Sequence, residues 1–274
     1  MKIRRVFSKS ADYQKFEVLQ QNRNKRYKYG EFIVEGVRNI NEAVKNNWQI
    51  SSFLYTRETP LSDWAEKLLF DIPVDVNYEL SEKLMGELSG KTDRSELLAI
   101  VHMREDTSGQ FRESENPLFV LFDRPSNKGN LGTIIRSCDA LDASGLILTG
   151  HAVDLYDPDV VTASMGSFFN FPTIRLQDKA SVQHFIEQNR SKYANFKVYG
   201  TTAHKQNPVY GAQLAEPMLL MIGNETDGLS RGLQELCDAL LTIPMAENGA
   251  ATSFNVGCAA TVFLYEAVRQ RAEK

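Results

Sequence analysis

The chain has 274 residues, which is enough for two domains of ordinary size. Hydrophobic residues make up 42% of it and charged residues 24%, a composition typical of a water-soluble globular protein. No apolar run approaches the ~20 residues that a membrane-spanning helix needs, and residues 1–5 are not followed by the apolar segment of a signal peptide. The three cysteines, Cys138, Cys237 and Cys258, lie far apart, so we expect free thiols in a reducing cytoplasm.

The formal net charge of −4 conceals a strongly basic N-terminal segment. Residues 1–30 contain nine basic and two acidic side chains, a balance of +7, so the remaining residues carry −11. Residues 22–29 interleave cationic side chains with two tyrosines and two asparagines, a mixture that contacts phosphates and stacks on bases. The predicted RNA-binding residues are Arg23, Lys25, Arg26 and Lys28. A merely solvated charged face is the alternative.

Residues 1–103 are predicted to form a small α/β domain, because short helical and extended segments alternate along them. The expected helices are residues 13–28, 37–46, 64–70 and 81–88, and the expected strands are 31–36, 52–56, 74–76 and 97–101. Residues 104–116 are polar and rich in turn-forming residues, so we interpret them as a linker.

Residues 117–274 are predicted to form a second α/β domain. Residues 118–123 are a continuous apolar run, which is typical of a strand covered on both faces. Further strands are expected at 145–149, 173–176, 197–202, 217–223 and 240–244, the last ending at a proline. Helices are expected at 131–141, 160–165 and 181–190, with a terminal helix of about 18 residues beginning at 253. This alternation indicates a parallel sheet, whose ligands bind beyond the carboxyl ends of the strands.

Three of these strand ends have an unusual composition, at residues 200–202 (GTT), 223–228 (GNETDG) and 243–245 (IPM). None has the spaced glycines of a dinucleotide-binding turn or a P-loop lysine. The four histidines lack metal-type spacing, so no metal is expected. No nucleophile elbow surrounds Ser253, which we interpret as the N-cap of the last helix or as a hydrogen-bonding residue rather than a nucleophile.

Three blocks of the second domain resemble the signature motifs of the SpoU/TrmH branch of the SPOUT superfamily, the RNA ribose 2′-O-methyltransferases. They are residues 127–136 (NKGNLGTIIR), residues 221–230 (MIGNETDGLS), and residues 243–245 (IPM) with 253–256 (SFNV). Residues 157–167 resemble an intermediate block of that family, and the likeness runs in order over about residues 117 to 270. The first domain is similar, more loosely, to the small RNA-recruiting domain of many members, which resembles ribosomal and kink-turn proteins.

The resemblance implies a SPOUT fold in which the C-terminal strand and helix form a deep trefoil knot around the S-adenosylmethionine site. Small residues at the start of the last helix, Gly257, Ala259 and Ala260, suit such threading. It also implies a homodimer whose second subunit completes the site. The implied cofactor-binding residues are Thr201, Thr202, Gly223, Ile243, Met245 and Phe254. The loop before Ser253 is about two residues longer than is usual in the family, and Phe254 replaces a commoner leucine.

Methyl transfer to a ribose hydroxyl is an in-line displacement that requires removal of a proton from a weak acid. Arg136 is too basic for ready deprotonation, so we assign it to orienting the hydroxyl and the adjacent phosphate; a role as the base itself stays open. The other implied catalytic residues are Asn130 and Asn255, which would fix Arg136 and the ribose, Glu225, a carboxylate near cationic groups, and Ser253, a proton relay. Asn130 as a helix cap and Glu225 as an ion-pair partner are the structural alternatives.

The predicted function is therefore transfer of a methyl group from S-adenosylmethionine to a 2′-hydroxyl of ribosomal RNA or transfer RNA. A non-catalytic RNA-binding or ribosome-assembly factor of the same fold is one alternative. An antibiotic-resistance rRNA methyltransferase with the same chemistry is another.

Overall fold

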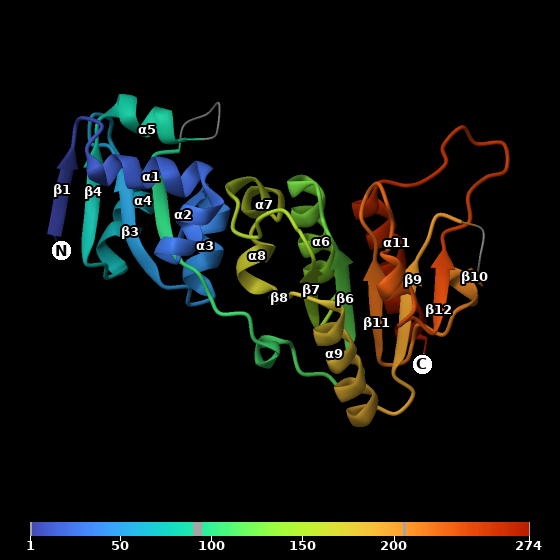
Figure 1. Ribbon diagram of the computed structural model, residues 1–274. Coiled ribbons are helices and arrows are strands. Elements are labelled where there is room, and N and C mark those ends of the chain that lie inside the picture. Colours follow the sequence, from blue (N-terminus) through green and yellow to red (C-terminus); the bar gives the residue numbers. More distant parts are fainter. Residues whose placement is uncertain (1, 90–94, 205–206, 274) are drawn as a thin grey trace. The chain divides into compact units, whose positions relative to one another are not determined.

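The computed structural model describes residues 2–89, 95–204 and 207–273, which fall into two compact units (Figure 1). Unit 1 consists of Met1–Glu105 and Asp154–Asn170, and unit 2 of Asp106–Val153 and Phe171–Lys274. The chain therefore changes unit three times along its length. This division differs from the predicted boundaries 1–103 and 117–274, because residues 154–170 pack with the N-terminal part of the chain.

Unit 1 contains a five-stranded sheet in the order β1-β4-β3-β5-β2. Strands β1, β4 and β3 pair in parallel, whereas β5 is antiparallel to both β3 and β2. The strands are β1 (Lys2–Val6), β2 (Glu31–Glu35), β3 (Ile50–Tyr55), β4 (Val76–Leu80) and β5 (Leu97–His102). The helices are α1 (Ala11–Gln21), α2 (Arg23–Tyr29), α3 (Val37–Lys45), α4 (Asp63–Asp71), α5 (Glu82–Leu88), α7 (Pro158–Ala163) and α8 (Ser167–Asn170). Strand β1 and helix α8 were not predicted.

The single helix predicted at 13–28 is wrong, because Asn22 interrupts it. Asn22 has an extended backbone, with φ −122° and ψ 107°, and its side-chain oxygen accepts a hydrogen bond from the Lys25 N–H, so it caps α2. Helix α1 ends at Gln21, directly before Asn22, and begins after its own N-cap, Ser10. The break makes α2 a separate short helix, which carries the basic side chains of Arg23, Lys25, Arg26 and Lys28.

Arg26 is buried in unit 1, with 1% of its surface exposed. Its guanidinium lies 2.6 Å from Asp154 and 3.2 Å from Asp157, and it also donates to the carbonyls of Leu19 and Gln20 at 3.0 Å. All of its charge is thus compensated inside the protein. The prediction that Arg26 contacts RNA is therefore corrected: two carboxylates from the 154–170 segment, distant in sequence, draw it inward.

Aromatic packing fixes the same segment to the sheet of unit 1. The rings of Tyr156 and Phe168 lie 5.0 and 5.7 Å from Phe32 of β2, centroid to centroid. The indole N–H of Trp48 donates to the carbonyl of Phe169 at 2.8 Å. Residues 154–170 are therefore part of the hydrophobic core of unit 1 rather than a surface excursion of the second domain.

Unit 2 contains a seven-stranded parallel sheet in the order β10-β12-β9-β11-β6-β7-β8 (Figure 1). The strands are β6 (Leu118–Asp123), β7 (Gly145–Thr149), β8 (Thr173–Leu176), β9 (Lys197–Thr201), β10 (Asn207–Pro208), β11 (Met218–Ile222) and β12 (Ala239–Thr242). The helices are α6 (Lys128–Ala140), α9 (Lys179–Lys192), α10 (Arg231–Gln234) and α11 (Val256–Ala272), with single 3₁₀ turns at Ser108–Gln110 and Val209–Gly211. Every residue of β6 and β11 is buried, which confirms that both faces of these strands are covered.

The segment predicted as a linker is only partly a connector, because it belongs to unit 2 from Asp106 onward. Phe111 packs on Phe119 of β6, with ring centroids 5.4 Å apart, and Arg112 pairs with Asp139 at 2.6 Å. A Cβ atom at Gly145 would lie 2.2 Å from the Phe111 ring, so glycine is required there. The composition of residues 104–116, which is rich in turn-forming residues, gave no indication that Phe111 packs in the core of unit 2.

The two helices that frame the site begin at asparagine caps. Asn127 accepts a hydrogen bond from the N–H of Asn130 and starts α6 three residues earlier than predicted. Asn255 accepts from the N–H groups of Gly257 and Cys258 at 2.9 and 3.3 Å and starts α11, so the predicted cap Ser253 is wrong. Helices α6 and α11 pack side by side, with the Ser137 and Thr261 hydroxyls 2.7 Å apart. Among the described residues, no helix has both the length and the apolar character to span a bilayer.

The buried charge cluster of unit 1 predicts a large stability cost for Arg26→Ala, which leaves Asp154 buried without its partner. We expect a loss of about 3–5 kcal/mol in the free energy of unfolding, measured by urea titration. Arg26→Lys keeps the charge but not the planar fork, so its loss should be intermediate. Lys28→Ala is the control, because Lys28 is exposed on the same helix. Equal urea midpoints for Arg26→Ala and Lys28→Ala would contradict the assignment.

Candidate functional site

A cavity of about 430 Å³ opens in unit 2 beyond the carboxyl ends of β9, β11 and β12. All six residues predicted to hold a cofactor line it: Thr201, Thr202, Gly223, Ile243, Met245 and Phe254. Glu225 and Ser253 line it as well, together with Val256, Ala259, Ala260 and Phe263 of α11. Three segments that are distant in sequence thus form one pocket, at the edge where the ligands of parallel sheets bind.

The wall that follows β11 is a loop closed on itself. Asn224 and Gly228 exchange two backbone hydrogen bonds, each of 3.0 Å, and Gly228 adopts the left-handed conformation with φ 68°. A Cβ atom at Gly223 would lie 2.2 Å from the backbone nitrogen of Leu229, so no larger residue fits. The predicted importance of Gly223 thus has a steric cause: the returning backbone passes directly over it.

Apolar residues form part of the cavity lining. Ile243, Met245 and Phe254 belong to the segment between β12 and α11, and Phe263 belongs to α11. Phe254 is 47% exposed, which is unusual for a large aromatic residue and places its ring at the mouth of the pocket. A lining that combines apolar residues with polar strand ends is suited to a ligand with an aromatic ring and a polar chain.

Glu225 is the centre of a hydrogen-bond network beside this cavity. Its carboxylate accepts from the N–H and the hydroxyl of Ser126 at 3.0 and 2.6 Å, from the N–H of Asn127 at 3.1 Å, and from the side-chain amide of Asn130 at 3.2 Å. The side-chain oxygen of Asn130 in turn accepts from the amide of Asn255 at 3.0 Å. The three predicted motifs therefore meet through Glu225, Asn130 and Asn255.

The donors around Glu225 are neutral, so the expected proximity to cationic groups is replaced by hydrogen bonding. Burial raises the pKa of Glu225, but the hydrogen bonds from Ser126, from backbone N–H groups and from Asn130 together lower it by more. The pKa consequently lies below the ordinary value of 4.5, and the carboxylate is ionised at neutral pH. An ionised Glu225 accepts hydrogen bonds only, which forces Asn130 to present its amide N–H₂.

Arg136 lies apart from this network. It is exposed on α6, one turn beyond Thr133, whose methyl group lies against Gly257 of α11. Its guanidinium forms no hydrogen bond or ion pair with the part of the chain that the structure describes. Asn130 and Asn255 thus bind each other rather than Arg136, contrary to the predicted arrangement, and Asn130 is not the cap of α6. Ser253 is exposed at the cavity.

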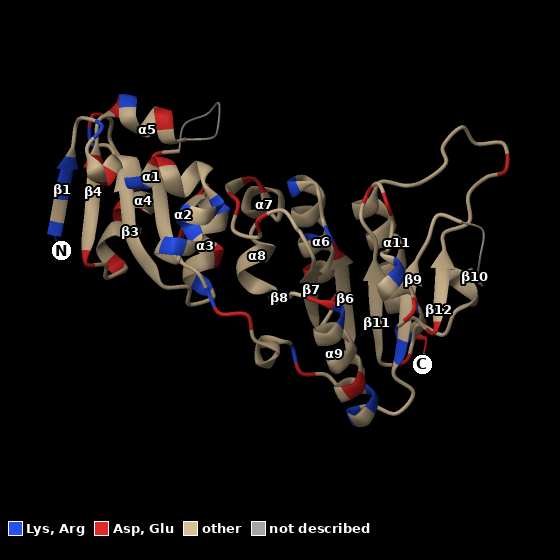
Figure 2. Ribbon diagram, viewed as in Figure 1, with Lys and Arg blue, Asp and Glu red and all other residues tan. Residues whose placement is uncertain are grey.

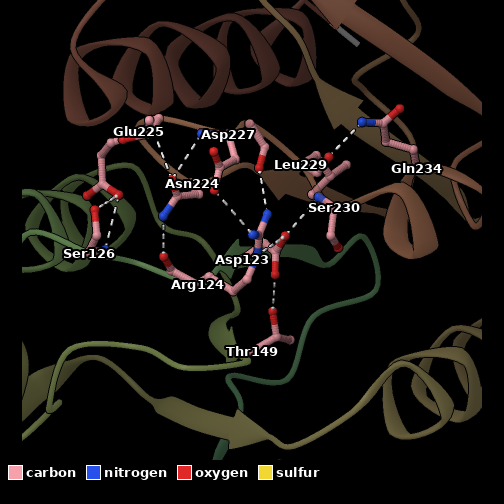
Figure 3. A network of polar contacts seen from close by, with 12 residues as sticks. Asp123, Arg124, Ser126, Thr149, Asn224, Glu225, Asp227, Leu229, Ser230 and Gln234 are labelled. Atoms are coloured by element: carbon pink, nitrogen blue, oxygen red, sulfur yellow. Dashed lines mark hydrogen bonds and ion pairs between the residues drawn. The ribbon is translucent and has the colours of Figure 1, made fainter.

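A second set of polar residues, which the sequence analysis missed, lies where β6 ends (Figure 3). Asp123 is 3% exposed and accepts from the Thr149 hydroxyl at 3.0 Å and from the Ser230 N–H at 2.9 Å. Arg124 donates to Asp123 at 3.1 Å and to the carbonyl of Gly228 at 3.0 Å. The sequence feature that could have revealed this set is Asp123 itself, because an aspartate directly after a buried apolar run lies at the carboxyl end of a strand, where ligands bind.

All four predicted RNA-binding residues lie in α2 of unit 1, and Figure 2 shows blue Lys and Arg positions along the ribbon of β1 and α2. Arg23 and Lys28 are exposed, and Lys25 is half-buried. The Arg23 guanidinium stands 5.7 Å from the ring centroid of Tyr27, and Tyr29 is 43% exposed. Within the described residues, no group of three or more His, Cys, Asp or Glu side chains is arranged to hold a metal ion.

Two family models match the chain. The model described as the SpoU rRNA Methylase family matches residues 117–265, and the SpoU L30e-like domain matches residues 10–99. A 23S rRNA (uridine(2479)-2′-O)-methyltransferase of Streptomyces viridochromogenes is 43% identical over 269 residues, which cover 98% of this chain and 93% of that protein.

Solved structures agree with these matches. The SpoU methyltransferase AviRb of Streptomyces viridochromogenes, crystallised in complex with the cofactor AdoMet, superposes with a TM-score of 0.90 at 42% identity and covers 96% of this chain and 98% of that one. An AdoMet-bound rRNA methyltransferase of Sinorhizobium meliloti superposes with a TM-score of 0.81 at 28% identity, covering 97% and 98% of the two chains.

The lowered pKa of Glu225 predicts a pH-dependent contribution to stability. A carboxyl group whose pKa falls on folding stabilises the folded state above the unfolded pKa, and this contribution disappears as the pH falls through the folded pKa. Glu225→Gln should therefore cost about 1–2 kcal/mol in the free energy of unfolding at pH 7. The difference from the unchanged protein should shrink below about pH 4. Urea unfolding of both proteins at pH 7 and at pH 3.5 measures it; a difference independent of pH would contradict the network.

Proposed function

Because the chain belongs to the SpoU rRNA methylase family, we propose that the cavity of unit 2 binds the methyl donor and that the adjoining polar network positions the acceptor ribose. The activity is S-adenosylmethionine-dependent transfer of a methyl group to a ribose 2′-hydroxyl of RNA, with ribosomal RNA as the substrate class. The observation that carries the assignment of the site is the meeting of Glu225, Asn130 and Asn255 beside the cavity.

The residues around the cavity fit the cofactor. Pockets for ligands of this size have volumes of about 300–1,000 Å³, and this cavity has about 430 Å³. Backbone groups beyond the strand ends, near Thr202, Gly223 and Ile243, would hold the polar parts, and Met245 with Phe254 would cover the adenine and the thioether. When bound, S-adenosylmethionine supplies an electrophilic methyl group on a sulfonium. With the donor bound, the apolar residues of the lining would keep water from competing with the ribose oxygen.

The network gives each amide a fixed direction. Ionised Glu225 accepts from the N–H₂ of Asn130, so the oxygen of Asn130 faces the N–H₂ of Asn255, and the oxygen of Asn255 faces the first turn of α11. Each amide nitrogen has two hydrogens, of which one is used in this chain. The second N–H of Asn255 is therefore a preoriented donor for the acceptor ribose.

Arg136 and Ser253 act on the reacting hydroxyl in this proposal. The unpaired guanidinium of Arg136 offers up to five donors to a phosphate and to the 2′-oxygen, which favours the partly deprotonated oxygen. The exposed hydroxyl of Ser253 receives the proton and passes it to solvent. Methyl transfer would break the bond from carbon to sulfur as the bond from carbon to oxygen forms. A neutral thioether would remain, and the positive charge would leave as the proton that Ser253 passes to solvent.

A homodimer and a knotted C-terminus belong to the same proposal. Val262 and Tyr265 of α11 are 40% and 61% exposed, an apolar face that supports burial against a second copy. Arg136, on the helix packed beside it, would then serve the composite site. Strand β12 pairs between β9 and β10 while α11 returns to α6, an order that supports a threaded terminus. Because the relative from Streptomyces viridochromogenes is named for a uridine of 23S rRNA, we place the target in 23S rRNA.

The proposed activity predicts that the protein transfers label from methyl-labelled S-adenosylmethionine to unmodified 23S rRNA and yields alkali-resistant dinucleotides. Arg136→Ala should keep cofactor affinity, measured by calorimetry, but lose turnover by about 100-fold or more, because its contribution is made in the transition state. Product without alkali-resistant dinucleotides would reject ribose as the acceptor. A loss of cofactor affinity as large as the loss of rate would reject the role of Arg136.

If Arg23, Lys25 and Lys28 of α2 contact RNA phosphates, changing all three to Ala should weaken RNA binding. The slope of log affinity against log salt concentration should fall by about 2, because each phosphate contact releases counterions. The matched control changes the same number of exposed lysines elsewhere in unit 1: Lys45, Lys67 and Lys83. Binding titrations at four salt concentrations measure both slopes. An equal reduction in the two triple variants would mean that net charge, rather than α2, governs binding.

A further inference from the structure

We propose that Arg124, anchored by buried Asp123, is a positioning residue that holds the loop at 224–230 as a preformed wall for the methyl donor. The inference rests on the proposed function for the identity of the ligand. It stands on the contacts of two residues that belong to none of the motif blocks, at the point where β6 ends.

The backbone of Arg124 is held in an unusual conformation. Its φ of 50° lies in the left-handed region, which non-glycine residues seldom adopt. Its N–H donates to the carbonyl of Thr149 at 3.0 Å, and its carbonyl accepts from the side-chain amide of Asn224 at 2.7 Å. Gly150 leaves space for the side chain, because a Cβ atom there would lie 2.6 Å from the Arg124 Cγ. A non-glycine residue held in this strained conformation points to a task for its side chain.

The guanidinium joins β6 to the loop after β11 (Figure 3). Its Nε donates to Asp123 at 3.1 Å, its Nη2 donates to the carbonyl of Gly228 at 3.0 Å, and its Nη1 lies 3.7 Å from Asp227. Asp123 is itself fixed by Thr149 and by the N–H of Ser230. The buried carboxylate therefore sets the direction of the guanidinium, and hydrogen bonds between charged groups are stronger than those between neutral ones.

Arg124 thus contacts both ends of one loop. Asn224 binds its carbonyl, Gly228 binds its guanidinium, and these two loop residues also bind each other through their backbones. Residues 224–229 between and beside these contacts line the cavity, and Glu225 extends from them to Ser126 and Asn130. Arg124 therefore acts as a clamp that fixes the cofactor wall, while Glu225 is held by its own hydrogen bonds from Ser126 and Asn130.

A wall that is fixed before binding spares the cofactor the entropic cost of ordering it. Loss of the clamp should therefore weaken donor binding while leaving the reaction of the bound donor nearly unchanged. Arg124→Gly removes the guanidinium but keeps a residue that adopts φ 50° readily, so the backbone turn is retained, and Asp123 keeps its hydrogen bonds from Thr149 and Ser230. Arg124→Lys keeps one cationic donor without the planar fork. Arg231→Ala, which removes an exposed arginine of unit 2 whose side chain is 94% exposed, is the control for charge.

Three quantities are measured on the full-length protein: hydrogen exchange of residues 224–230 without ligand, the Kd for S-adenosylmethionine by calorimetry, and kcat with saturating donor. In Arg124→Gly we expect faster exchange in the loop, a Kd about tenfold higher and a kcat within about twofold of the unchanged protein. Arg124→Lys should recover about half of the loss on a logarithmic scale, and Arg231→Ala should change none of the three.

Unchanged exchange in Arg124→Gly would overturn the clamp, and so would faster exchange with an unaltered Kd. A fall in kcat at constant Kd would place Arg124 in the reaction instead and would overturn the positioning role. If the unchanged protein binds no S-adenosylmethionine, the proposed function fails, and loop exchange still decides whether Arg124 holds the loop.

Discussion

The acceptance of hydrogen bonds by Glu225 is the interaction on which the site depends. Its partners come from the turn before α6, at Ser126 and Asn127, and from Asn130 within that helix, while Glu225 itself follows β11. Because a carboxylate accepts but does not donate, its ionisation determines which way the amides of Asn130 and Asn255 face. One charge, stabilised by neutral donors, thereby imposes the polarity of a chain of side chains that reaches the N-terminus of α11.

The parallel sheet makes this convergence possible. Asn130 is 95 residues from Glu225 and 125 residues from Asn255 along the chain. Bringing together residues so distant in sequence costs conformational entropy, and burial of the apolar strands of the sheet offsets this cost. The carboxyl ends of the parallel strands then lie at one edge. Residues that follow β6, β9, β11 and β12 are therefore close enough to contact one another at the site. The cavity is a consequence of topology, whereas its selectivity depends on the few polar groups around it.

Local patterns in the sequence predicted most strands of unit 2, because runs such as Leu118–Asp123 are apolar over their whole length and admit no other environment. The resemblance to the family motifs predicted the cavity wall as well, because Gly223, Met245 and Phe254 all line the cavity. Helix starts were less accurate: Ser253 and Asn255 are both good caps by type, and only the backbone direction decides between them. Arg26 was misplaced because its acidic partners, Asp154 and Asp157, are 128 and 131 residues away, and no local spacing reveals such a pair.

The buried contacts of Arg26 with Asp154 and Asp157 also limit how the two units can be recombined with those of relatives. The SpoU L30e-like match ends at residue 99, yet the core of unit 1 includes Asp154–Asn170 from within the stretch that matches the methylase model. A chimera made by a single cut near residue 105 would give Arg26 a foreign set of neighbours and leave the Phe32 ring without Phe168. Exchange of unit 1 between relatives would therefore require the transfer of both of its pieces, Met1–Glu105 and Asp154–Asn170.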